Sequence, residues 1–170
     1  MTSKRFLNKY KKTISEEGQL LINEFFVTFS RFECALKTTI TYAVGNANRV
    51  DPNWDRYIAD IRNNFNKTKS KELQVASDFL LQNPPRKQTL DNGSLSWTDR
   101  VFQNNEPEIN KLSLHIRDIR NNLFHGGKFN GIYERDISRN YKLINAALIV
   151  LNEFIVLNQE VQTAFVSDFQ

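Results

Sequence analysis

Histidine and cysteine are scarce in this sequence, and their scarcity limits the chemistry that the side chains can perform. The 170 residues include two histidines, His115 and His125, and one cysteine, Cys34. A structural zinc site requires four cysteine or histidine ligands, so one chain cannot supply it. A single thiol also excludes a disulfide within the chain. Acid–base chemistry by an imidazole near neutral pH must therefore use His115 or His125.

The glycines match neither of two common phosphate-binding patterns. They stand at positions 18, 45, 93, 126, 127 and 131. This spacing fits neither G-x-G-x-x-G, the dinucleotide-binding pattern, nor G-x-x-x-x-G-K-[ST], the P-loop pattern. We accordingly expect no metal and no cofactor.

One string combines a histidine with a nearby arginine at the predicted end of a helix. It reads Arg120-Asn121-Asn122-Leu123-Phe124-His125-Gly126-Gly127-Lys128. A helix without function can end in the same way, because basic residues suit the negative end of the helix dipole and glycine suits the left-handed position beyond it. Chemistry offers a second interpretation. Arginine binds phosphate oxygens and stays charged, and histidine exchanges protons near neutral pH.

Cleavage of RNA without a metal needs groups of these two kinds. The 2′-hydroxyl is the nucleophile, so a base must remove its proton and an acid must protonate the leaving 5′-oxygen. Positive charge must stabilise the pentacoordinate phosphate. One arginine and one histidine supply half of this set, whereas a two-fold dimer that places both motifs together supplies all of it. The products would be a 2′,3′-cyclic phosphate and a 5′-hydroxyl.

Over residues 112–128 the sequence resembles the signature of the HEPN superfamily of helical domains. That signature is R-x(4–6)-H near the end of a late helix, often with a polar residue directly after the arginine. Arg120 and His125 match the arginine and the histidine, and Asn121 matches the polar position. The resemblance implies that Arg120 and His125 are catalytic and that Asn121 supports them. The His-x-Tyr pattern that some toxin members carry downstream does not occur in this sequence.

The resemblance also implies an activity and partners. HEPN toxins and anti-phage effectors are metal-independent endoribonucleases and commonly homodimers whose motifs face each other, whereas other members have lost activity and serve as binding modules. We therefore expect an endoribonuclease of toxin–antitoxin or phage-defence systems that acts on RNA as a homodimer, with an antitoxin or defence protein as a further partner. The alternatives are a non-catalytic helical module that binds RNA or a protein, and a structural or adaptor bundle.

Other residues have weaker claims to a role. Arg117, on a neighbouring helical face, could touch phosphate, pair with Asp118 or face solvent. Lys128 could hold the RNA backbone or lie in a solvated loop. His115 lies at the edge of an apolar seam, which favours a partly buried structural role. Cys34 is expected in the core.

Charge divides the chain into a basic arm and a near-neutral body. Residues 1–12 carry five basic side chains and no acid. Since the whole chain has a formal charge of +4, subtracting these five leaves −1 for the rest. The arm is either a solvated tail or a contact for a polyanion. Residues 111–142 form the other basic concentration, with seven basic against three acidic side chains.

The apolar spacing predicts an all-α fold, a single domain over residues 1–170 built as a bundle of four to five helices. Helices are expected at about 14–43, 52–65, 73–83, 107–125 and 138–165. The pattern Thr13-x-x-Glu16 predicts a capping box at the start of the first. Asp51-Pro52 is typical of the start of the second.

Two further segments carry specific expectations. Residues 84–104 hold turn formers and are expected to be an irregular connection, of the kind that often covers a site, which Leu95 and Trp97 could attach to the body. The middle of the last helix, Leu143 to Ile155, is apolar on nearly all sides, which is typical of a helix central to a bundle or buried between subunits.

A membrane location is not indicated. The stretch from Leu143 to Leu157 is too short and too polar to span a bilayer. Glu16 and Glu17 precede any apolar stretch near the N-terminus, unlike in a signal peptide. We expect a cytoplasmic protein.

Overall fold

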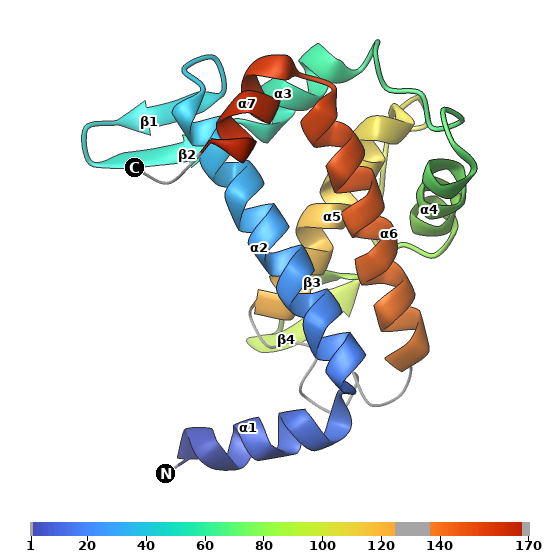
Figure 1. Cartoon of the computed structure of the whole chain (residues 1–170). Coiled ribbons are helices and arrows are strands. Elements are labelled where there is room, and N and C mark those ends of the chain that lie inside the picture. Colours follow the sequence, from blue (N-terminus) through green and yellow to red (C-terminus); the bar gives the residue numbers. More distant parts are fainter. Residues whose placement is uncertain (1, 125–136, 168–170) are drawn as a thin grey trace.

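The computed structural model describes residues 2–124 and 137–167, which form a mainly helical body with two β-hairpins (Figure 1). The prediction of a mainly helical fold is confirmed. The described residues hold seven helices rather than four or five, because the basic arm is itself helical and the last predicted helix is divided. The elements follow in this order: α1 (Thr2–Thr13), α2 (Glu16–Thr38), β1 (Ala43–Asn46), β2 (Arg49–Pro52), α3 (Trp54–Ile61), α4 (Lys71–Gln82), β3 (Lys87–Asp91), β4 (Ser94–Thr98), α5 (Glu108–Phe124), α6 (Ile137–Val156) and α7 (Gln159–Val166).

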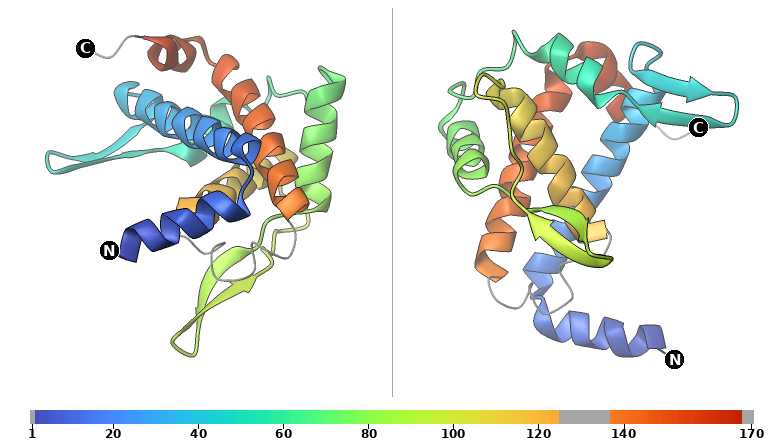
Figure 2. Two further views of the ribbon diagram at one scale, coloured as in Figure 1. Left: turned by 60° about the horizontal axis from the view of Figure 1, so that its bottom comes forward. Right: turned by 180° about the vertical axis from the view of Figure 1, so that it is seen from behind.

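Helix α6 is the centre of the hydrophobic core. It packs against α2, α4, α5 and α7 (Figures 1 and 2). Its apolar side chains are buried within this one chain: Leu143, Ile144, Ala146, Ala147, Leu148, Val150, Leu151, Phe154 and Ile155. Each large one contributes roughly 1.5–3 kcal/mol of hydrophobic stabilisation. Of the two places predicted for this helix, the centre of the bundle is the one observed.

The predicted helix 138–165 is interrupted near its end. Helix α6 ends at Val156, and α7 continues at an angle of 113° to it. Asn158 causes the break, because its Oδ1 accepts a hydrogen bond from the Val161 amide at 3.0 Å and so caps a new helix. Among the described residues, no single helix is long and apolar enough to cross a membrane. The bent pair α6–α7 meets that criterion only when both helices are counted together.

The basic arm is helix α1, which leaves the body at the N-terminal end of α2 (Figure 2). The predicted capping box is wrong. Ser15, not Thr13, caps α2, with its Oγ accepting from the Gly18 amide at 3.2 Å. The Thr13 hydroxyl instead donates backwards to the Lys9 carbonyl at 2.9 Å, inside α1. Helix α1 therefore ends, and α2 begins, at a junction formed by Ile14 and Ser15.

The first predicted helix ends early, and a hairpin follows. Helix α2 stops at Thr38, and β1 pairs with β2 in an antiparallel hairpin, with Ala43 opposite Pro52. Asn53 caps α3, its Oδ1 accepting from the Arg56 amide at 3.1 Å, so the start predicted at Asp51-Pro52 is wrong by two residues. Pro52 is tolerated because it stands at the end of an edge strand.

The segment 84–104, predicted to be irregular, contains the second hairpin. Asn92 and Gly93 join β3 to β4 with φ angles of 47° and 77°. Two consecutive left-handed residues make the tight turn that suits the twist of a hairpin, and asparagine followed by glycine is the usual pair there. Trp97 is half-buried, but Leu95 is about 49% exposed and does not attach the segment to the body.

Two helices agree closely with their predictions. Helix α4 ends at Gln82, just before the two prolines, and α5 begins at Glu108, directly after Pro107. Proline cannot continue a helix but suits its first turn. Helix α5 is the element that carries the motif.

Candidate functional site

The apolar seam of α5 determines where the motif arginine lies. Leu112, Ile116 and Ile119 are completely buried against the core. Successive helical residues are separated by about 100°, so Arg120 follows Ile119 at the edge of the seam and is half-buried. Asn121 comes next, near the C-terminal end of the helix. The core therefore holds both side chains in place.

The Arg120 guanidinium group contacts the Phe29 ring and the Asn121 side chain. Its Cζ lies 5.5 Å from the centroid of the buried Phe29 ring, within range of a cation–π interaction. Its Nη1 donates a hydrogen bond to Asn121 Oδ1 at 3.0 Å. The structure thus brings these two predicted site residues together, with the ring and the amide orienting the charge.

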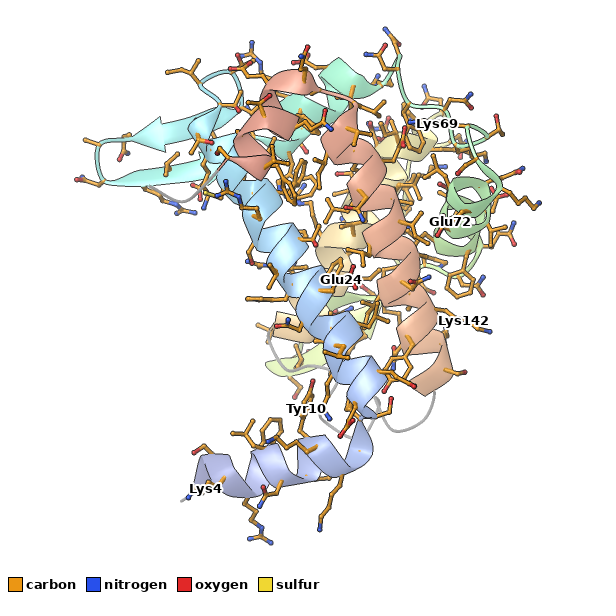
Figure 3. The ribbon with its side chains drawn as sticks, in the orientation of Figure 1. Lys4, Tyr10, Glu24, Lys69, Glu72 and Lys142 are labelled. Carbon is orange, nitrogen blue, oxygen red and sulfur yellow. The ribbon has the colours of Figure 1, made fainter. Side chains whose placement is uncertain are left out.

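Arg120 is part of the wall of a cavity of about 340 Å³ between α1, α2 and α5. Half of the lining side chains are apolar, and the other half can form hydrogen bonds: Ile22, Phe25, Phe26 and Leu123, and Tyr10, Gln19, Asn23 and Arg120. Tyr10 reaches from α1 toward the body (Figure 3). Burial, and secondarily the nearby Tyr141, raises the pKa of Tyr10, so its hydroxyl stays protonated at neutral pH. Aromatic rings beside a guanidinium suit a base and a phosphate.

The structure places Arg117 away from Arg120. Arg117 extends toward α3, where its Nη1 lies 3.6 Å from Asp55 Oδ1 and its Cζ lies 5.9 Å from the Trp54 ring. The suggested pair of Arg117 with Asp118 is therefore wrong. His125 and Lys128 lie outside the described residues.

His115 is buried, as predicted, with 2% of its surface exposed. Its ring meets the Phe102 ring edge-on, with the centroids 5.4 Å apart. Burial lowers the pKa of His115 to about 4, because the charged form loses its hydration; Arg100 and Lys111 act in the same direction and Asp118 against it. His115 is thus neutral and enclosed at neutral pH.

Cys34 is half-buried rather than in the core. The core face of α2 carries Phe25, Phe29 and Phe32, and at 100° per residue Cys34 falls on the opposite side of the helix. Its sulfur accepts a long hydrogen bond from Arg31 Nη1 at 3.9 Å.

Sequence reasoning missed a buried ion pair beside Asn121. Arg100 Nε and Nη2 donate to the two carboxylate oxygens of Asp118 at 2.8 and 2.7 Å, and Asp118 is 4% exposed. The pair lines a second cavity, of about 240 Å³, together with Lys87, Gln88, Asn121 and Asn122. No signal in the sequence joined Arg100 to Asp118, because the hairpin that ends at Thr98, just before Arg100, was not expected.

Sequence reasoning also missed Tyr10, although a signal was present. Phe6, Leu7 and Tyr10 recur at helical spacing between the basic residues of the arm. That spacing is typical of an amphipathic helix, whose apolar face must lie against something.

Residues 2–124 and 137–167 contain no group of three or more histidine, cysteine, aspartate or glutamate side chains able to hold a metal ion. Comparison with models of protein families, with curated proteins and with solved structures finds no match for this chain. The motif and the geometry around Arg120 are therefore the features that indicate a function.

Proposed function

We propose that this chain is a metal-independent endoribonuclease of the HEPN type, with Arg120 and His125 as its catalytic pair. One observation carries the proposal: a half-buried arginine, held by Phe29 and Asn121, lines a cavity near the end of a late helix, five residues before a histidine. The mainly helical fold and the place of the motif on α5 support it.

The proposed reaction needs proton transfer and charge stabilisation only. His125 removes the proton from a 2′-hydroxyl, and that oxygen forms a bond to the adjacent phosphorus. The bond from phosphorus to the 5′-oxygen breaks, and a second imidazole, from the partner subunit, protonates the leaving oxygen. Arg120 binds the non-bridging phosphate oxygens as their charge grows. The products are a 2′,3′-cyclic phosphate and a 5′-hydroxyl.

Helix α1 is the proposed surface for the RNA backbone. At 100° per residue, its five basic side chains occupy one side, and Phe6, Leu7 and Tyr10 occupy the other. Since Tyr10 lines the Arg120 cavity, these cations belong to the same helix that forms one of its walls. Cations with neighbouring aromatic rings are typical of surfaces that bind single strands. Arg117 and Lys128 remain secondary candidates for phosphate contacts.

We also propose a homodimer with a composite site. Because α6 is buried in its own chain, it provides no interface. Phe6, Leu7 and Phe26 are instead 47%, 50% and 43% exposed on α1 and α2 near the cavity, and a second copy could cover them. An antitoxin or defence protein as a further partner belongs to the same proposal through the resemblance alone. The cytoplasmic location expected from the sequence is part of the proposal as well.

Cleavage assays in excess EDTA test the proposal. Wild-type protein is expected to cut single-stranded RNA and leave a 2′,3′-cyclic phosphate, and Arg120→Ala and His125→Ala should each lower the rate by about 10²-fold or more. Arg49→Ala is the matched control, because Arg49 is an exposed hairpin residue whose side chain is 77% exposed. Products are identified by mass and by resistance of their 3′ ends to a phosphomonoesterase.

A second candidate function has one observation in its favour. Half of the side chains that line the Arg120 cavity are apolar, which also suits a non-catalytic module that binds RNA or a protein. That function predicts RNA binding without turnover, little changed by His125→Ala. Cutting by wild type that both Arg120→Ala and His125→Ala leave intact would instead show that the site assignment is wrong.

A further inference from the structure

The second cavity, between the β3–β4 hairpin and α5, has the features of a built polar site. Figure 2 shows this hairpin against the C-terminal part of α5. The cavity measures about 240 Å³ and shares no lining residue with the Arg120 cavity. The two are nevertheless adjacent along α5, because Arg120 lines one and Asn121, its hydrogen-bond partner, lines the other.

Two buried amide atoms in this cavity have no hydrogen-bond partner within the described part of the chain. They are Gln88 Nε2, a donor, and Asn122 Oδ1, an acceptor. Asn122 is 4% exposed, and its Nδ2 donates to the Arg86 carbonyl at 2.8 Å, so Oδ1 is the atom of this amide that lacks a partner. Native proteins leave few buried polar atoms unsatisfied, so this donor and acceptor call for a ligand.

The charges of the cavity narrow the class of that ligand. Asp118 is engaged by both Nε and Nη2 of Arg100, so its carboxylate is neutralised in place. Lys87 adds an exposed cation on β3. A phosphodiester group offers only acceptors and would leave Asn122 Oδ1 unpaired. A metal ion would find one carboxylate, which Arg100 already engages. The ligand must therefore both donate and accept hydrogen bonds while carrying an anion nearby.

We propose that this cavity binds one nucleobase, with Gln88 and Asn122 hydrogen-bonded to its edge and Lys87 near its phosphate. A base edge presents donors and acceptors side by side, which is how unstacked bases are recognised. The volume is below that of sites for drug-sized ligands and suits a single ring system. The base can belong to an RNA strand or to a free nucleotide, which share this chemistry. Binding of an RNA strand rests on the proposed function, whereas binding of a free nucleotide does not.

The experiment measures how tightly nucleotides bind to three full-chain proteins: wild type, Gln88→Met and a control, Gln82→Met. The control changes an exposed glutamine at the end of α4. One arm uses the four ribonucleoside 5′-monophosphates. The other uses labelled hexanucleotides of each base with 2′-fluoro sugars, which lack the attacking hydroxyl. Wild type should prefer one base in at least one arm, and Gln88→Met should weaken that base by about fivefold or more and abolish the preference.

Thermal unfolding distinguishes a structural role of Gln88 from a role in ligand binding. Because its Nε2 is unpaired without ligand, Gln88→Met should not lower the melting temperature, and Lys87→Gln should weaken binding most at low salt. Equal binding of all bases, or Gln88→Met behaving as Gln82→Met, overturns the proposal even if RNA is cleaved. Absence of cleavage with Gln88-dependent binding of a mononucleotide overturns the proposed function and leaves this inference standing.

Discussion

At the scale of single residues, burial assigns different roles to side chains of the same type. His115 is enclosed beside Phe102 and neutral, so it cannot exchange protons with a substrate. The buried Asp118 is matched by Arg100, whereas Arg117, one position before it, reaches the exposed Asp55. The helical position of each residue, rather than its type, decides whether it stabilises the core or faces a ligand.

Stability should depend on pH through His115. Its pKa is about 4 in the folded protein and about 6.5 when unfolded, so the unfolded chain binds more protons between these values. The contribution of His115 to the free energy of unfolding is complete above pH 6.5 and is lost as the pH falls through 4. The total loss is roughly 3 kcal/mol. Urea unfolding from pH 7 to pH 4 should show this loss in wild type and not in His115→Leu. Parallel curves for the two proteins would contradict it, since Asp118, Arg100 and Lys111 remain in both.

Removing Arg100 should destabilise the fold strongly. In Arg100→Leu the buried Asp118 carboxylate loses its partner, which is expected to lower the free energy of unfolding by about 3–5 kcal/mol. The double variant Arg100→Leu/Asp118→Leu should recover most of this loss, because no unpaired charge remains. Arg49→Leu, which breaks an exposed pair with Asp51, is the control and should cost less than about 1 kcal/mol. Equal effects of Arg100→Leu and Arg49→Leu would show that the Asp118 pair is not buried in solution.

At the scale of elements, short polar side chains set the boundaries that apolar spacing leaves open. Ser15 separates α1 from α2, Asn53 starts α3 after a hairpin, and Asn158 starts α7. Each accepts a hydrogen bond from an amide that its helix leaves unpaired. Several polar residues near each boundary could accept such a hydrogen bond. The path of the chain into the helix, which packing determines, selects one of them.

The cap of α2 can be tested against the residue that the sequence suggested. Ser15→Ala should lower the free energy of unfolding by about 1 kcal/mol, because the Gly18 amide loses its acceptor. Thr13→Ala should change it by less than about 0.5 kcal/mol, since that hydroxyl only bonds back to Lys9. Both are measured by urea unfolding, to which the junction contributes because Ile14 is 2% exposed. A larger effect at Thr13 than at Ser15 would contradict this assignment.

At the scale of the whole molecule, the fold places the basic helix α1 and the exposed side chains of Phe6, Leu7 and Phe26 on the side of the Arg120 cavity. Helix α1 lines the Arg120 cavity through Tyr10 and carries its cations on its other side, with Lys4 toward its far end (Figure 3). The body itself is close to neutral. An interface on the apolar side of α1 would leave the basic side available to RNA.

The proposed dimer surface makes a prediction for assembly. Leu7→Glu should place a charge in that interface and weaken self-association by at least about tenfold in sedimentation experiments. The control is Leu90→Glu on the β3–β4 hairpin, where leucine is 79% exposed. Neither change should alter the circular dichroism spectrum, since neither residue is in the core. Identical sedimentation of the two variants would exclude α1 as the interface.

Apolar periodicity was enough to predict most of the helices and their inner faces. Residues such as Leu112 and Ile116 are buried where the spacing predicts, because an α-helix presents every third or fourth side chain to one side. The hairpins were not predicted, because strands of four or five residues show too little alternation to stand out. The turn formers of residues 84–104 were recognised, but the strands on either side of the turn were not.

The sequence by itself determined which chemistry is available: two histidines, one of them five residues after an arginine, and a basic arm. Only the tertiary structure decided that His115 is enclosed and that Tyr10 and Arg120 line the same cavity. It also placed Gln88 of the hairpin and Asn122 of α5 in the lining of a second cavity. The physical reason is that residue type and local spacing act along the chain, whereas burial, pKa and cavities arise from packing between segments far apart in sequence.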